Sequence, residues 1–77
     1  MSYEIDGQYA NVRWKSNNYK TLATLNRYVK FKHKILEPGD YWCVCQCSGD
    51  PKSYDPEVWK VVERSHPEAE AWFEYIG

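Results

Sequence analysis

The chain has 77 residues, a formal net charge of −1 and 17% aromatic residues, including four Trp and seven Tyr. This length excludes a second domain, and the slightly acidic balance is unlike that of dedicated nucleic-acid binders. We therefore expect one small domain over residues 1–77, with some of its rings at the surface because so small a core cannot bury them all.

Cysteine usage and hydropathy bear on where the protein works. No apolar run reaches the length that crosses a bilayer, and no charged and then apolar leader opens the sequence. The three cysteines all lie within residues 43–47, unlike the spread-out framework of a disulfide-rich secreted domain. We expect no contact with a membrane, a cytoplasmic location and a reducing compartment.

Charge is strongly segregated along the chain. Residues 1–6 carry −2, residues 7–36 carry +7 with no acidic residue, and residues 37–77 carry −6. Two interpretations stay open: the oppositely charged parts fold against each other, or one of them contacts a partner.

The first predicted element is a hairpin. Asp6-Gly7 is a typical two-residue turn between a short strand at residues 2–5 and a longer one at about 8–15. In the longer strand Ala10, Val12 and Trp14 alternate with polar residues.

Residues 20–36 admit two interpretations. Leu22 and Leu25 follow candidate capping residues and predict a short helix near residues 20–26, which in the alternative interpretation continues through Lys34. We favour a strand from Tyr28, because aromatic and β-branched residues are frequent and alternate with lysines. The alternating positions are Val29, Phe31, His33 and Ile35 against Lys30, Lys32 and Lys34.

Pro38 and Gly39 predict a type II turn, from which residues 41–48 return as the partner strand. Directly paired residues of antiparallel strands share a face. The expected register therefore places the three cysteines beside the lysines, on the face of the hairpin that is turned to water.

Two helices are expected near the C-terminus. Asp55-Pro56 is a typical helix start, and Ser65 with Glu68 forms a capping box for a last helix. The apolar positions of that helix have amphipathic spacing: Ala69, Trp72, Phe73 and Ile76. The expected fold class is α+β, with a small antiparallel sheet of three to four strands packed against two C-terminal helices and a short helix near residues 20–26.

The cysteines do not predict a metal site. Structural zinc uses four ligands, commonly from two cysteine pairs, and no second pair exists here. Small, partly buried strand residues are the favoured interpretation, and thiols activated by nearby lysines are the alternative. We predict no metal and no cofactor.

The sequence also gives little basis for catalysis. It has two histidines, no Gly-rich phosphate loop and no Ser-His-Asp or paired-carboxylate pattern. In the expected register His33 faces away from the cysteines. We predict that the protein is not an enzyme.

The remaining signal is a basic stretch with interleaved rings, which are Tyr9, Trp14, Tyr19, Tyr28 and Phe31. We expect a protein-binding regulator or inhibitor that uses exposed aromatics and polarised charge. The alternative is a nucleic-acid-binding module that uses the basic N-terminal strands, and a homodimer is also open. The candidate partner-binding residues are Arg13, Trp14, Lys15, Tyr28, Lys30, Lys32, Lys34 and Trp59.

Overall fold

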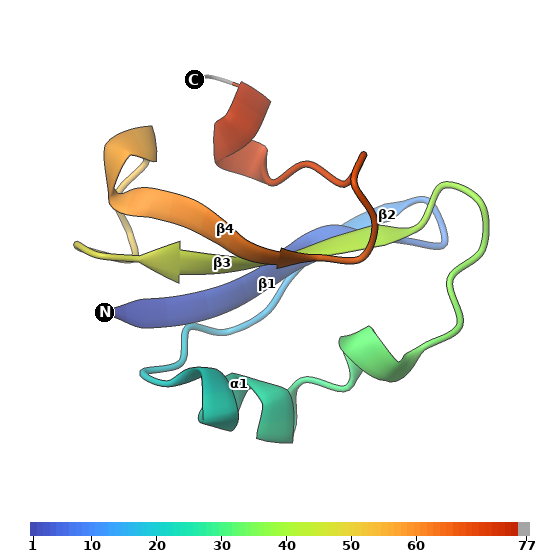
Figure 1. The fold of residues 1–77 in the computed structure, drawn as a ribbon, viewed down its shortest axis with the longest axis horizontal. Coiled ribbons are helices and arrows are strands. Elements are labelled where there is room, and N and C mark those ends of the chain that lie inside the picture. The colour runs from blue at the N-terminus through green and yellow to red at the C-terminus, as the bar shows by residue number, and fades with distance from the viewer. Residues whose placement is uncertain (76–77) are drawn as a thin grey trace.

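The computed structural model describes residues 1–75 and contains a four-stranded antiparallel sheet in the order β2-β1-β3-β4 (Figure 1). The strands are β1 (Ser2–Tyr9), β2 (Val12–Lys15), β3 (Tyr41–Cys47) and β4 (Trp59–Arg64). The α-helix of the described residues is α1 (Leu22–Tyr28), and the 3-10 turns are η1 (Phe31–His33), η2 (Pro56–Val58) and η3 (Trp72–Tyr75). The α+β class, the strand number and the short helix are confirmed.

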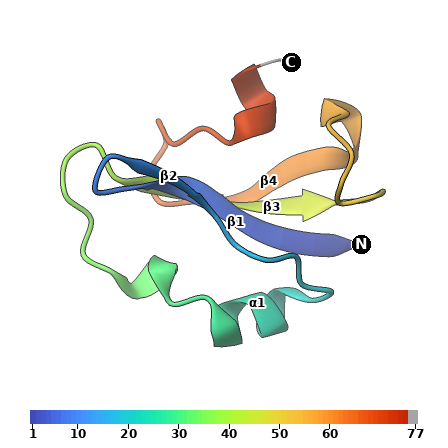
Figure 2. The same ribbon diagram turned by 180° about the vertical axis from the view of Figure 1, so that it is seen from behind.

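The sheet lies between two layers of different construction (Figures 1 and 2). On one side, here called the helix face, α1 and η1 cover a core that includes Ile5, Leu25 and Val44. On the other side, here called the cysteine face, residues 65–75 cover the three cysteines without forming an α-helix.

The N-terminal hairpin turns later than the sequence predicts. Its turn residues are Ala10 and Asn11, both with positive φ, and Tyr9 pairs with Val12. The prediction of a turn at Asp6-Gly7 is wrong, because Gly7 lies within β1 between Trp14 and Trp42. A glycine is required there for a different reason: a Cβ atom would collide with the carbonyl oxygen of Tyr41.

The predicted strand at residues 28–36 is wrong. Thr21 caps α1 by accepting a hydrogen bond from the Thr24 amide at 3.1 Å, and the helix continues to Tyr28 before η1 begins. The predicted alternation of buried residues ends after Val29 and Phe31, because His33 and Ile35 are exposed. The alternative of a helix continuing through Lys34 is not observed either, since α1 ends at Tyr28. The Pro38-Gly39 turn is confirmed by a φ of 96° at Gly39 and a 2.9 Å bond from the Asp40 amide to the Glu37 carbonyl.

The prediction of two C-terminal helices is also wrong. Asp55 caps only the single turn η2, after which the β-branched and aromatic sequence of β4 enters the sheet. Ser65 does not cap a helix, because its hydroxyl accepts the Trp42 amide at 3.0 Å. Residues 65–71 follow the sheet as bends and turns up to η3, and Ile76 lies outside the described residues.

A β-bulge in β4 decides where its charged residues lie. Val44 pairs with Glu63 and Cys45 with Val61, so that Val62 is the extra residue. The bulge sends Glu63 to the helix face, where it contacts Lys32 at 2.8 Å. Arg64 is directed to the cysteine face, where it contacts Glu74 at 2.7 Å.

Candidate functional site

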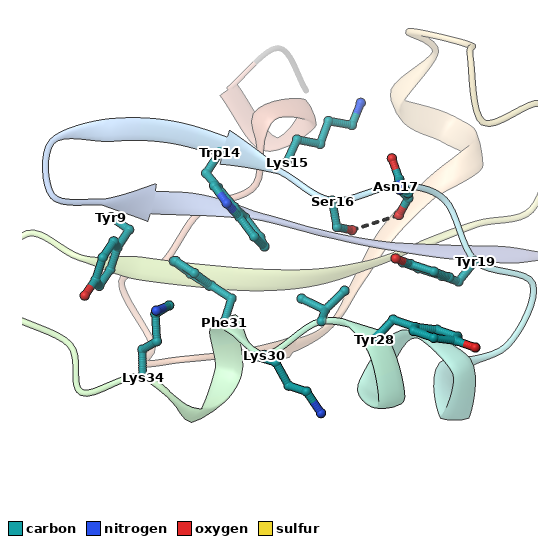
Figure 3. Close-up of a pocket in the computed structure, with 11 residues that line it drawn as sticks. Tyr9, Trp14, Lys15, Ser16, Asn17, Tyr19, Tyr28, Lys30, Phe31 and Lys34 are labelled. Carbon is teal, nitrogen blue, oxygen red and sulfur yellow. Dashed lines mark hydrogen bonds between the residues drawn. The ribbon is translucent and has the colours of Figure 1, made fainter.

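A groove of about 470 Å³ lies between the end of β2 and the segment that joins α1 to η1 (Figure 3). Trp14, Ser16 and Asn17 form one side of it, and Val29 and Phe31 form the other. It brings together five rings, from β1, β2, the loop before α1, α1 itself and η1, although these rings are scattered in the sequence.

Two stacked ring pairs flank the groove. Trp14 from β2 stacks on Phe31 of η1 with ring centroids 4.3 Å apart and an interplanar angle of 20°. Tyr19 and Tyr28 stack at 6.1 Å and 13°, and Tyr19 is fixed to β1 by backbone bonds of 2.7 and 2.8 Å with Tyr3. The walls are therefore held by the sheet and by α1, with the buried Val29 between them.

The charge at the groove is positive. Three of the residues that line it are lysines: Lys15, Lys30 and Lys34. The lining residues include no aspartate or glutamate. The Lys34 ammonium lies 5.4 Å from the centre of the Tyr9 ring, and the Lys30 side chain points away from the ring stacks (Figure 3). The Lys15 side chain instead points toward the cysteine face, where its ammonium lies 3.3 Å from Glu4 (Figure 3).

The groove gathers five of the eight candidate partner-binding residues, which are Trp14, Lys15, Tyr28, Lys30 and Lys34. Arg13 lies outside it and contacts Asp6 at 3.2 Å. The Lys32 ammonium lies 5.3 Å from the centre of the Trp42 ring and pairs with Glu63.

Trp59 is 5% exposed and belongs to the core of the cysteine face. The candidate list missed Tyr9, Tyr19 and Phe31, although their interleaving with basic residues was the signal that pointed to them.

The cysteines are buried and do not share a face with Lys30, Lys32 and Lys34, which lie at η1 on the other side of the sheet. This corrects the predicted register. All three pack under Ala69, Ala71 and Phe73. Burial raises the pKa of the Cys43 thiol to about 11 and raises the pKa of Cys45 further still. Both thiols are therefore protonated at neutral pH, which disfavours the alternative of activated cysteines. Within residues 1–75 no cluster of His, Cys, Asp and Glu is placed to hold a metal ion.

Two buried carboxylates stand beside the cysteines in the sheet. Glu4 pairs with Cys45 and Asp6 with Cys43, and each carboxylate residue is 4% exposed. Asp6 accepts the backbone amide of Trp72 at 2.9 Å and so fastens the C-terminal segment to the sheet. Burial raises the pKa of Asp6, and the bonds from Trp72 and Arg13 oppose that rise. These contacts identify the pair as a structural element.

Comparison of the chain with protein-family models, curated proteins and solved structures finds no match. Within the described residues, no helix has the length and apolar character to span a bilayer.

Proposed function

We propose that the protein is a small non-catalytic binding module, a regulator or inhibitor that holds an acidic segment of a partner protein in the aromatic groove. The observation that carries this proposal is the composition of the groove: two aromatic stacks with lysines and no carboxylate among its lining residues. Aromatic anchors within a charged rim are typical of protein-binding surfaces.

The ion pairs of the molecule leave one region with uncompensated positive charge. Arg13, Lys15 and Arg64 are each paired with a carboxylate at the cysteine face. By contrast, four cations between residues 20 and 34 make no ion pair within residues 1–75, and these are Lys20, Arg27, Lys30 and Lys34. The segment that borders the groove therefore attracts acidic ligands.

The ring contacts favour a protein partner over nucleic acid. Bases bind such grooves by stacking on free ring faces. Here Trp14 is already stacked on Phe31. The Tyr28 ring is stacked on Tyr19, and the Arg27 guanidinium lies 5.6 Å from the centre of the Tyr28 ring. The N-terminal strands offer phosphates little free charge, because Arg13 and Lys15 are engaged by Asp6 and Glu4.

The polar groups of the groove support a role in binding. The Ser16 hydroxyl accepts the Ile5 amide at 2.9 Å and donates to the Asn17 carbonyl at 2.8 Å. No histidine or carboxylate is among the residues that line the groove and would act as a base. These contacts use the hydroxyl to hold the loop, which supports a non-catalytic role. The proposal places the module in the cytoplasm, because its three cysteines are clustered within residues 43–47 and do not form the spread-out framework of a secreted domain.

The test compares two double variants with the same change in charge. Lys30→Glu with Lys34→Glu reverses the charge at the groove, and Lys52→Glu with Lys60→Glu reverses it at exposed positions that do not line the groove. Binding is measured by calorimetry against polyglutamate and against a short oligothymidylate, in low and in physiological salt. A pull-down from lysate with the same proteins then shows whether a cellular partner has the same dependence.

We expect polyglutamate to bind the wild type and the control variant, with an affinity at least about tenfold lower for the groove variant, or a difference of about 1.4 kcal/mol. Equal loss in both variants would show that net charge alone matters and would overturn the proposal. Tight binding of oligothymidylate without binding of polyglutamate would establish the nucleic-acid alternative. The mass of the protein in solution tests the homodimer.

A further inference from the structure

The strand β2 forms one edge of the sheet and borders the groove. In an antiparallel pair every second residue turns its backbone N–H and C=O away from its neighbour. The two-residue turn at Ala10 and Asn11 is flanked by a hydrogen-bonded pair, so Val12 and Trp14 bond to β1. The backbone groups of Arg13 and Lys15 are then the ones that face the free edge.

The side chains of β2 give this edge two chemically different sides. Trp14 faces η1 across the groove, and Val12, which lies on the same face, is 62% exposed. The Arg13 and Lys15 side chains lie on the opposite face and stay 45% and 48% exposed despite their ion pairs. An added strand would meet apolar groups on one side and cations on the other.

We propose that β2 accepts an additional strand from the partner, namely an extended segment in which acidic and apolar side chains alternate. The inference rests on the proposed function and specifies its binding mode. Strand addition would place the partner about 4.8 Å from β2. Its apolar side chains would lie beside Val12 and Trp14 at the mouth of the groove. Its carboxylates would lie beside the exposed parts of Arg13 and Lys15 and would share these cations with Asp6 and Glu4.

The two edges of the sheet differ in how well they accept a strand. The β4 edge is interrupted by the bulge at Val62, which disrupts the regular spacing of outward backbone groups. The β2 edge is only four residues long and carries two cations, which disfavours pairing with basic strands or with a second β2. Arg13 and Lys15 already have carboxylate partners, so the charge that favours an acidic strand comes mainly from Lys30 and Lys34, which make no ion pair within residues 1–75 and line the groove beside this edge.

The test uses a synthetic peptide of alternating Glu and Leu residues, blocked at both ends, and the full-length protein. Amide hydrogen exchange is followed by NMR at a peptide concentration about ten times its Kd. We expect exchange at Arg13 and Lys15 to slow by about tenfold, because only the free protein exposes these amides. The amides of Val12 and Trp14 are already bonded within the sheet and serve as internal controls.

A second measurement examines the backbone of the peptide. Moving a single N-methyl group along the peptide should reduce affinity at every second position, since a strand bonds its neighbour through alternate residues. A scrambled peptide with its glutamates clustered at one end is the matched control, and we expect at least about tenfold weaker binding from it.

The outcomes separate this inference from the proposed function. If the peptide binds and the groove variant abolishes that binding, but Arg13 and Lys15 exchange as before, strand addition is wrong and the proposed function stands. If neither this peptide nor polyglutamate binds, the proposed function itself is wrong. N-methyl effects without a period of two would also overturn strand addition.

Discussion

The two faces of the sheet are made from the same strands and are built in opposite ways. Toward the helix face β3 contributes Trp42 and Val44, which meet Leu25 and Phe31 in a core of large side chains. Toward the cysteine face β3 contributes three cysteines, which meet Ala69 and Ala71. Small side chains on both sides of that contact let a non-helical segment lie close to the sheet.

The faces also differ in how their charges are used. On the cysteine face the buried carboxylates Glu4 and Asp6 contact Lys15, Arg13 and the backbone amide of Trp72, so polar contacts within the protein hold the layer in place. The helix face has an ion pair between Lys32 and Glu63, while Lys30 and Lys34 at the groove form no ion pair with any residue of the described range 1–75. One face uses its polar groups for its own stability, and the other keeps some for a ligand.

The largest expected effect tests this difference in packing. Leu25 and Cys45 are 0% and 1% exposed, but Leu25→Ala removes three heavy atoms and Cys45→Ala removes one. We expect Leu25→Ala to lower the free energy of unfolding by about 2–5 kcal/mol and Cys45→Ala by about 1 kcal/mol. Urea denaturation of both variants measures this, and equal losses would contradict the comparison.

The second prediction concerns the cover over the cysteines. Phe73 is buried at the cysteine face and belongs to the terminal segment, so Phe73→Ala should let this cover open without global unfolding. Phe→Ala in a core costs about 3–5 kcal/mol, and we expect most of this cost to lower the free energy of local opening. The thiols should then be modified about a hundredfold faster or more. The rate of reaction with an aromatic disulfide reagent measures it.

Leu25→Ala is the control for that experiment, because it lowers global stability and leaves the cover in place. The thiols should react faster in Phe73→Ala than in Leu25→Ala at similar global stability. The same rate in both variants would mean that the cysteines become accessible only through global unfolding.

The third prediction uses the raised pKa of Asp6. Because burial raises this pKa above the unfolded value of about 3.9, the folded protein takes up the proton first as the pH falls. The stabilisation from that proton is present at low pH and is lost as the pH rises through the folded-state pKa. Denaturation at neutral pH and near pH 4 should show the wild type gaining stability relative to Asp6→Asn on acidification.

Glu74, on the same face, has a pKa shift of the opposite sign to that of Asp6. The Arg64 guanidinium holds the pKa of Glu74 below its ordinary value, so its contribution is lost only as the pH falls through that lowered pKa. Glu74→Gln should therefore leave the acid-induced gain of Asp6 intact. If the acid-induced gain in stability vanished in Glu74→Gln and persisted in Asp6→Asn, Glu74 and not Asp6 would be the carboxylate responsible for it.

Local patterns predicted some elements well and failed where two patterns competed. The short helix was found because Leu22 and Leu25 follow capping residues, and the turn at Gly39 because its positive φ suits glycine. The prediction of a strand at residues 28–36 failed because alternating and helical spacing overlap there: Val29 and Phe31 are buried as alternation predicts, but α1 extends to Tyr28 and Ile35 is exposed. Ser65 resembled a helix cap, but its hydroxyl serves Trp42, which is a tertiary contact.

The groove was predictable in composition and not in shape. Its rings were visible as an interleaving with basic residues, which is a local feature of the chain. Trp59 is absent from the groove because the C-terminal segment covers it in the core of the cysteine face. Lys32 pairs with Glu63 because the bulge at Val62 turns Glu63 to the helix face. Neither the bulge nor a cover without an α-helix has a periodic signal in the sequence.

The smallest expected effect compares the two ion pairs that this bulge creates, one on each face. Lys32 reaches Glu63 through a single 2.8 Å contact, and Glu63 is 44% exposed. Arg64 binds Glu74 through two bonds of 2.7 Å each, a bidentate geometry that holds both side chains. Double-mutant cycles should give a coupling energy of about 0.3–0.5 kcal/mol for the first pair and about 1 kcal/mol for the second.

Added salt should weaken the Lys32–Glu63 coupling more than the Arg64–Glu74 coupling, because Lys32–Glu63 has the more exposed carboxylate. A stronger coupling for Lys32–Glu63 would mean that charge fastens the helix face more than the cysteine face, contrary to the difference drawn between them.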